Sequence, residues 1–184
     1  MPRVRDVGPQ EVSADVREVY ESFASGYGAF RDQVGVFAHV PIAVKHLMAM
    51  MLELRAQKNV PLRYIELAVV VVSKLNECDY CVGQHKPLLV IEGLSPEGVD
   101  RALEYATHPE FDAVDKLVVE YAIAVTNAPQ RIRDSVFERL RNHFTEAQIV
   151  ELTLRIALCG FFNRFNEALQ IDGAAVPAPR SNLK

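Results

Sequence analysis

The sequence lacks the features that would place the protein in a membrane or on a nucleic acid. Its unbroken apolar runs, such as those at 67–72 and 156–162, are far shorter than the roughly 18 to 20 residues that a helix needs to cross a bilayer. No run of Lys or Arg exceeds two residues, and 24 acidic against 20 basic side chains give a net charge of −4. Because a nucleic-acid footprint is normally basic and clustered on one face, we expect neither a membrane span nor a nucleic-acid partner.

Cysteine is also scarce. Cys78, Cys81 and Cys159 are too few for the disulfide framework of a small secreted domain. The first ten residues carry positive charge but no apolar core, so no secretory signal is predicted. We therefore expect a cytoplasmic protein. In a reducing cytosol, a close cysteine pair favours catalysis or metal binding.

The remaining composition is that of an ordinary globular protein. Of the 184 residues, 49% are hydrophobic and 24% are charged, and only 9 are glycine and 10 proline. This length is typical of one domain with one core. We expect a single helical domain over residues 1–172, followed by an irregular tail at 173–184 that has no periodicity.

Apolar residues recur at helical spacing along most of the chain, which predicts an all-α fold. The run 67–72 is β-branched, but no partner strand alternates elsewhere, so it is interpreted as part of a buried helix. An N-cap is expected at Ser95, and a capping box at Thr145 and Gln148. The expected helices cover residues 12–25, 41–58, 95–106, 112–127, 133–142 and 146 onward.

A weak internal echo appears when the chain is offset by 85 residues. Glu66 then falls on Glu151, with apolar positions matching around them. This echo is consistent with a degenerate duplicated helix pair. The second copy would have lost the polar motif of the first, because Cys78, Cys81 and His85 fall on Asn163, Asn166 and Gln170.

The most informative motif is a Cys-x-x-Cys pair, Cys78 and Cys81, followed by His85. Two sulfurs at this spacing can close a short disulfide, and a helix N-terminus lowers a thiol pKa. If a helix begins near Cys78, the dipole favours the first sulfur as the reactive thiolate. Cys81, however, is the cysteine with an imidazole one turn later at i+4, which can take or deliver its proton.

Glu66 can join this group only if the chain turns. In one unbroken helix it would lie about 22 Å along the axis from Cys81. We expect the turn at Asn76–Glu77, which would fold one helix back on the other and bring the carboxylate to the imidazole. A carboxyl group among Leu and Val side chains would have a raised pKa if unpaired, which suits a proton carrier.

Structural interpretations of the same residues stay open. The two cysteines and His85, with Glu66 as a fourth ligand, could bind zinc, although structural zinc usually takes more Cys or His ligands. Tyr80 is interpreted as a packing residue and Cys159 as a buried, inert thiol. The remaining histidines have no mutual metal spacing and are taken as surface or satisfied core residues: His39, His46, His108 and His143.

The spacing Glu-x11-Cys-x2-Cys-x3-His resembles the alkylhydroperoxidase AhpD-like branch of the carboxymuconolactone decarboxylase family. The looser resemblance runs from Pro41 to Ile171 and includes a peroxidase-related segment at 163–169. It implies an all-α, cofactor-free, homo-oligomeric thiol peroxidase, either a trimer or a hexamer, with no metal. By the same resemblance, Cys81 would attack the peroxide and Cys78 would resolve the sulfenic acid. Glu66 and His85 would relay protons through water. Many such relatives have His where this chain has Tyr80.

Three functions follow from these observations. The first is a thiol-dependent hydroperoxide reductase or thiol–disulfide oxidoreductase, which needs a peroxide and a dithiol or protein-thiol reductant. The second is a lactone decarboxylase of the same superfamily, for which a redox cysteine pair has no use. The third is a non-enzymatic, redox-sensing protein.

Overall fold

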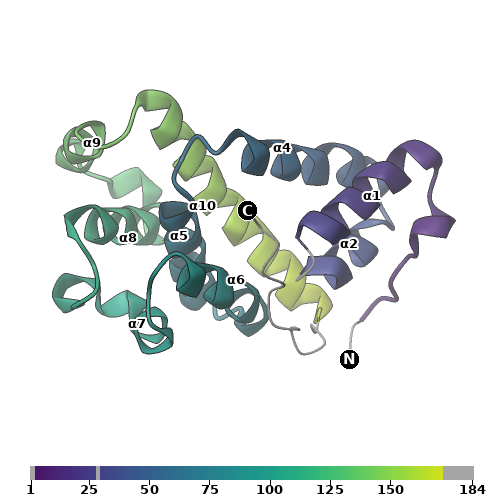
Figure 1. Cartoon of the computed structure of the whole chain (residues 1–184), viewed down its shortest axis with the longest axis horizontal. Helices are drawn as coiled ribbons and strands as arrows, with labels where there is room; N and C mark the ends of the chain where they lie inside the picture. Colours follow the sequence, from purple (N-terminus) through teal and green to yellow (C-terminus); the bar gives the residue numbers. More distant parts are fainter. Residues whose placement is uncertain (1–2, 28–29, 172–184) are drawn as a thin grey trace. The chain divides into compact units, whose positions relative to one another are not determined.

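The structure is a computed structural model that describes residues 3–27 and 30–171 (Figure 1). All the secondary structure in these residues is helical, which confirms the predicted all-α fold. The chain divides into two compact units, one formed by residues 1–58 and 166–184 and the other by residues 59–165. The single-domain boundary at residue 172 stays a prediction, and the tail at 173–184 lies outside the described residues.

The first unit is built from short helices around a small apolar core. Its core includes Val16, Tyr20, Phe23, Val34 and Met48. The expected helix at 41–58 is present but is not uniform, because a π-helical stretch lies in its middle. The elements are η1 (Pro9–Glu11), α1 (Ala14–Gly26), α2 (Arg31–Phe37), α3 (Pro41–Ala43), the π-helix η3 (Val44–Met48) and α4 (Ala49–Gln57).

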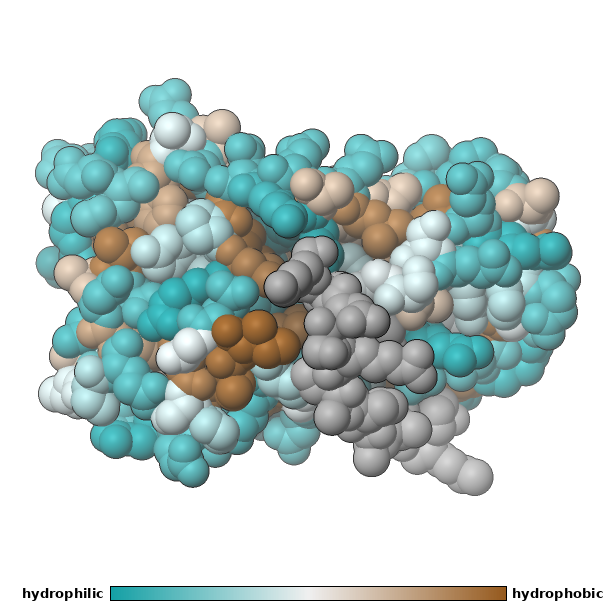
Figure 2. Space-filling model, viewed as in Figure 1, coloured by the Kyte–Doolittle hydropathy of each residue, from teal (hydrophilic) through white to brown (hydrophobic). Residues whose placement is uncertain are grey.

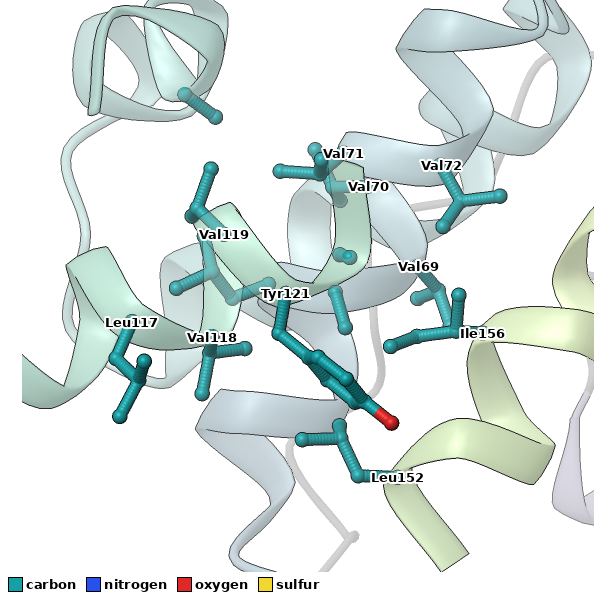
Figure 3. Close-up of a cluster of buried hydrophobic side chains, with 14 of the residues drawn as sticks. Val69, Val70, Val71, Val72, Leu117, Val118, Val119, Tyr121, Leu152 and Ile156 are labelled. Atoms are coloured by element: carbon teal, nitrogen blue, oxygen red, sulfur yellow. The ribbon is translucent and has the colours of Figure 1, made fainter. Parts of the chain in front are cut away.

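The second unit contains the cysteine motif and is arranged around one apolar helix, α5 (Leu62–Leu75), which packs against α6 and α8 (Figures 1 and 3). The run 67–72 is buried on all sides within α5, which confirms its interpretation as helix. The other elements are α6 (Asp79–Ile91), α7 (Pro96–Asp100), η4 (Ala102–Thr107), α8 (Ala113–Asn127), η5 (Pro129–Arg131), α9 (Asp134–Arg141) and α10 (Glu146–Leu169).

The core of the second unit lies between α5, α8 and α10. Figure 3 shows Val69 to Val72 of α5, Val118 and Tyr121 of α8, and Leu152 and Ile156 of α10 gathered in one cluster of buried side chains. The Tyr121 hydroxyl is satisfied by Thr153 Oγ1 at 2.6 Å. Close packing of branched aliphatic side chains from three helices holds α5 in a fixed position. One end of α5 makes polar contacts with α8, and the other end leads to the cysteine motif.

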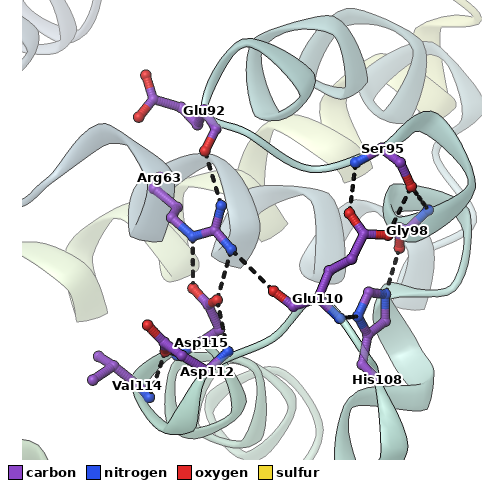
Figure 4. Close-up of polar contacts among 9 residues, drawn as sticks. All are labelled: Arg63, Glu92, Ser95, Gly98, His108, Glu110, Asp112, Val114 and Asp115. Atoms are coloured by element: carbon purple, nitrogen blue, oxygen red, sulfur yellow. Dashed lines mark hydrogen bonds and ion pairs between the residues drawn. The ribbon is translucent and has the colours of Figure 1, made fainter.

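An ion pair joins Arg63, near the beginning of α5, to Asp115, near the beginning of α8 (Figure 4). Arg63 donates from Nε to Asp115 Oδ1 at 2.9 Å and from Nη2 to Oδ2 at 2.7 Å. Its Nη1 donates to the Glu92 carbonyl at 2.8 Å. The hydrogen bond to Asp115 raises the pKa of Arg63 above its ordinary value.

The predicted helix boundaries agree with the capping residues. Ser95 Oγ accepts from the Gly98 N–H at 2.9 Å, and the Gln148 N–H donates to Thr145 Oγ1 at 3.3 Å. His108 is a satisfied core residue, as expected: its Nδ1 accepts from the Glu110 N–H at 3.2 Å, so its Nε2–H donates to the Gly98 carbonyl at 2.9 Å.

Two expectations are corrected by the structure. The helix expected at 95–106 ends at Asp100 and gives way to 3-10 turns. The Asp100 carbonyl accepts from the ammonium of Lys74 at 3.0 Å, and the Glu104 N–H donates to the Arg101 carbonyl, so the α-helical bond from Glu104 to Asp100 is replaced. The offset echo is not a second helix pair, because Glu146–Leu169 is one continuous helix with no turn at the equivalent of Asn76. Apolar residues at helical spacing on both segments account for the echo.

Candidate active site

Cys78 and Cys81 form a disulfide at the junction of α5 and α6. Their Cα atoms are 5.3 Å apart, and the residues are 0% and 2% exposed. Cys78 is the N-cap of α6, and its Sγ accepts the backbone N–H of Cys81 at 3.4 Å. A helix therefore begins at Cys78, which is the condition under which the helix dipole favours the first sulfur, and that sulfur occupies the positive end of the helix.

The chain turns at Asn76–Glu77, as the spacing predicts. Asn76 is the C-cap of α5, and Glu77 adopts the left-handed conformation with φ +55°. The N–H of Glu77 bonds to the Lys74 carbonyl at 3.2 Å and the N–H of Cys78 to the Ser73 carbonyl at 3.0 Å. This is a Schellman motif, so Cys78 completes the end of one helix and begins the next.

The turn brings Glu66 of α5 to His85 of α6. Oε2 of Glu66 lies 2.7 Å from Nδ1 of His85, and the two side chains are 4% and 17% exposed. An ionised carboxylate only accepts hydrogen bonds, so Nδ1 carries the proton that faces Glu66. A carboxylate paired with an imidazole in this way is an arrangement that can carry a proton in general acid–base catalysis.

The other residues predicted near this motif occupy the places expected of packing residues. Tyr80 is half-buried and Cys159 is buried. Burial raises the pKa of the Cys159 thiol to about 12, which leaves it protonated and unreactive at neutral pH. In the disulfide form neither Cys78 nor Cys81 presents a thiolate to a metal, and no group of three or more His, Cys, Asp or Glu side chains in residues 3–27 and 30–171 is arranged to bind one.

Two buried polar residues near the motif were missed by sequence reasoning. Gln84, one turn after Cys81, is 4% exposed, and its Oε1 has no hydrogen-bond partner within the part of the chain that the structure describes. Asn163 of α10 is 1% exposed and bonds to Asn76 and Ser73. Neither has a local sequence signal, because their burial depends on segments distant in the chain.

Comparison with known proteins agrees with this geometry. The model of the carboxymuconolactone decarboxylase family matches residues 41–108, which contain the whole motif. The uncharacterized protein YnjA of Escherichia coli is 24% identical over 160 residues, covering 84% of this chain and 87% of YnjA. No helix in the described residues is long and apolar enough to cross a membrane.

Solved structures share the fold over nearly the whole chain. The alkylhydroperoxidase AhpD core of an uncharacterized peroxidase-related protein from Ralstonia eutropha is 23% identical, with a TM-score of 0.80 and coverage of 96% of this chain and 97% of that one. A cysteine-to-alanine variant of the debrominase Bmp8, in complex with 2,3,4-tribromopyrrole, is 18% identical, with a TM-score of 0.76 and coverage of 94% and 91%. Residues 41–108 thus match the carboxymuconolactone decarboxylase family model, and the chain has the all-α fold of the AhpD core.

Proposed function

We propose that this protein is a thiol-dependent hydroperoxide reductase in which Cys78 and Cys81 are the redox pair. The observation that carries the proposal is the 2.7 Å contact between Glu66 of α5 and His85 of α6, the helix that the cysteine pair begins. A redox-active pair beside a buried carboxylate–imidazole pair combines a nucleophile with a proton carrier. The similarity to peroxidase-related proteins of the same fold supports it.

The reaction balances with these four residues and an external dithiol. The Cys81 thiolate attacks a peroxide oxygen and breaks the O–O bond, which gives a sulfenic acid and an alkoxide or hydroxide. His85 delivers a proton to this leaving group and then regains a proton through Glu66 and water. The Cys78 thiol then attacks the sulfenic sulfur, which releases water and forms the disulfide. An external dithiol or protein thiol reduces the disulfide back to two thiols.

The position of each cysteine supports this division of roles. His85 lies at i+4 from Cys81 on α6, one turn later, where it can act on that sulfur. The positive end of α6 stabilises negative charge on Cys78, the N-cap residue. A stabilised thiolate is a good leaving group, so an external thiol that attacks Cys81 would displace Cys78. The dipole therefore favours reduction of the disulfide, and the imidazole favours attack on peroxide.

We propose that the protein works as a homo-oligomer, a trimer or a hexamer, in the cytoplasm. Its surface in Figure 2 is mostly hydrophilic but includes apolar side chains. In the second unit, Ile91 is 61% exposed, Val150 67% and Phe161 46%. Exposed apolar side chains can be buried between subunits, so these three residues are the candidates for an interface. Light scattering should give a mass of a trimer or more, and a mass near 20.6 kDa would contradict the proposal.

A second candidate is reductive dehalogenation, because the debrominase Bmp8 shares the fold over almost all of both chains. The dithiol pair could reduce a carbon–bromine bond, giving a carbon–hydrogen bond, the disulfide and HBr. Such a reaction consumes the same two electrons as peroxide reduction. It would use Cys78 and Cys81 in the same oxidation, so the substrate alone distinguishes the two activities.

A substrate-consumption assay tests these functions together. The reduced protein is mixed with excess dithiothreitol and either hydrogen peroxide, an alkyl hydroperoxide or 2,3,4-tribromopyrrole, with a Cys78→Ser/Cys81→Ser variant as the control. Catalytic loss of peroxide that the control lacks supports the proposed function. Turnover of the bromopyrrole alone favours the second candidate. One stoichiometric oxidation without turnover would instead indicate redox sensing, and no thiol oxidation would favour a lactone decarboxylase.

A further inference from the structure

A cluster of four side chains, those of Ser73, Asn76, Cys159 and Asn163, contacts the turn that precedes Cys78. Nδ2 of Asn76 donates to Oδ1 of Asn163 at 2.9 Å, and Nδ2 of Asn163 donates to Oγ of Ser73 at 3.2 Å. The Cys159 thiol lies 3.4 Å from Ser73 Oγ and 3.7 Å from Asn163 Oδ1. All four residues belong to the second unit, and they connect the end of α5 to α10.

This cluster contacts the cysteine turn at two points. Asn76 is the C-cap residue immediately before the left-handed Glu77. The carbonyl of Ser73 accepts the N–H of Cys78 at 3.0 Å, while its hydroxyl accepts from Asn163. The Asn163 amide therefore bonds to both residues whose positions determine where the backbone of Cys78 lies. Because Asn163 is only 1% exposed, its amide lies in surroundings of low dielectric constant, which strengthens these bonds.

We propose that Asn163 is a positioning residue for the cysteine pair, and that its amide favours the disulfide by fixing the turn before Cys78 against α10. This inference rests on the proposed redox role of the pair. When the disulfide is reduced, the two sulfurs must separate to a non-bonded distance, which a fixed turn resists. Without Asn163 the turn is released, the dithiol form gains conformational freedom, and the effective concentration of one thiol at the other falls.

The Cys159 thiol of this cluster takes no part in thiol–disulfide exchange. The pKa of Cys159, raised to about 12 by burial, keeps it protonated at neutral pH, and its Sγ donates to the Val69 carbonyl at 3.4 Å. The cluster is therefore neutral, and a change in the thiol–disulfide equilibrium reports on Cys78 and Cys81 alone.

The test measures the equilibrium between this disulfide and dithiothreitol by thiol alkylation and mass spectrometry. Asn163→Ala should shift the equilibrium toward the dithiol by about fivefold, the effect of losing roughly one net hydrogen bond. Asn166→Ala is a matched control, because Asn166 is also 1% exposed on α10 and its side chain also accepts a hydrogen bond, from Gln33 Nε2 at 2.9 Å. It should lower the melting temperature by a similar amount and leave the equilibrium within about twofold.

A double-mutant cycle separates positioning from general loosening. Asn76→Ala removes the other end of the same bond, so it should shift the equilibrium as Asn163→Ala does, and the double variant should shift it little further. Additive shifts, an unchanged equilibrium in Asn163→Ala, or an equal shift in Asn166→Ala would overturn the inference. If Asn163→Ala does not fold, the equilibrium of Asn76→Ala tests the inference by itself. A shift toward the dithiol supports the inference, and an unchanged equilibrium overturns it. Because the equilibrium needs no peroxide, a protein that fails to reduce peroxide still gives a clear answer.

Discussion

Nδ1 of His85 and Oε2 of Glu66 lie 2.7 Å apart although 19 residues separate them in the chain. Only the reversal at Asn76–Glu77 makes this contact possible, because a straight helix would separate the two residues by about 28 Å. The same reversal places Cys78 at the positive end of α6. One turn with a left-handed residue therefore determines both the Glu66–His85 contact and the environment of the first sulfur.

The role of this pair can be tested by removing its charge while keeping its shape. Glu66→Gln can still accept a hydrogen bond from His85 but cannot stabilise an imidazolium, and His85→Gln removes the titrating ring. Each should slow the reaction of the reduced protein with peroxide by roughly 10²-fold. Stopped-flow measurement of a single turnover reports this step directly. Wild-type rates in both variants, with unchanged helical content, would remove the pair from the mechanism.

The roles of the two cysteines give a second prediction. In Cys78→Ser, the remaining thiol has His85 one turn away, so it should react once with peroxide and stop at a sulfenic acid that dimedone traps. Cys81→Ser retains only the N-cap thiol and should not react appreciably. Mass spectrometry after one equivalent of peroxide locates the adduct. A sulfenic acid found on Cys78 in Cys81→Ser, with none on Cys81 in Cys78→Ser, would reverse the assignment.

The sequence predicts the local part of this architecture well. The apolar period predicts α5 and α8, the capping residues Ser95 and Thr145 predict the beginnings of α7 and α10, and the spacing from Glu66 to His85 requires the turn that the structure shows. Contacts between distant segments have no such signal. Arg63 meets Asp115 across 52 residues, and Asn76 meets Asn163 across 87, and each pairing depends on how α5 packs against α8 or α10. The π-helical stretch at 44–48 likewise leaves no mark on the apolar period.

The left-handed turn makes a prediction about stability. Glu77 has φ +55°, a conformation in which a β carbon costs roughly 1 kcal/mol and glycine costs nothing. Glu77→Gly should therefore raise the free energy of unfolding by about 0.5 to 1 kcal/mol. Urea denaturation of the oxidised protein measures it. Glu77→Ala, which keeps the β carbon, is the control and should show no gain, and equal gains in both variants would contradict the explanation.

The buried ion pair in Figure 4 predicts a larger effect. Asp115 is fully buried and accepts two bonds from Arg63 and one from the Asp112 N–H, so Asp115→Ala removes three hydrogen bonds at once and should cost about 2 to 4 kcal/mol. The pair Lys45–Asp15 is the control, because its side chains are about half exposed and Asp15→Ala should cost far less. Thermal unfolding of both variants compares them, and similar losses would show that burial does not decide the effect.

Acid should destabilise the first unit through Glu11. Hydrogen bonds from Arg5, and then from the Gly8 N–H, lower the pKa of Glu11 from 4.5 to about 2. A carboxyl whose pKa is lower in the folded protein stabilises it above its unfolded pKa, and this contribution disappears as the pH falls through the folded value. Glu11→Gln should therefore flatten the loss of stability between about pH 5 and pH 2, as measured by urea unfolding monitored by circular dichroism. Glu21→Gln, which changes the net charge equally on an exposed position, should leave the slope close to that of the wild type. A slope unchanged in Glu11→Gln would show that the Arg5 contact does not persist in solution.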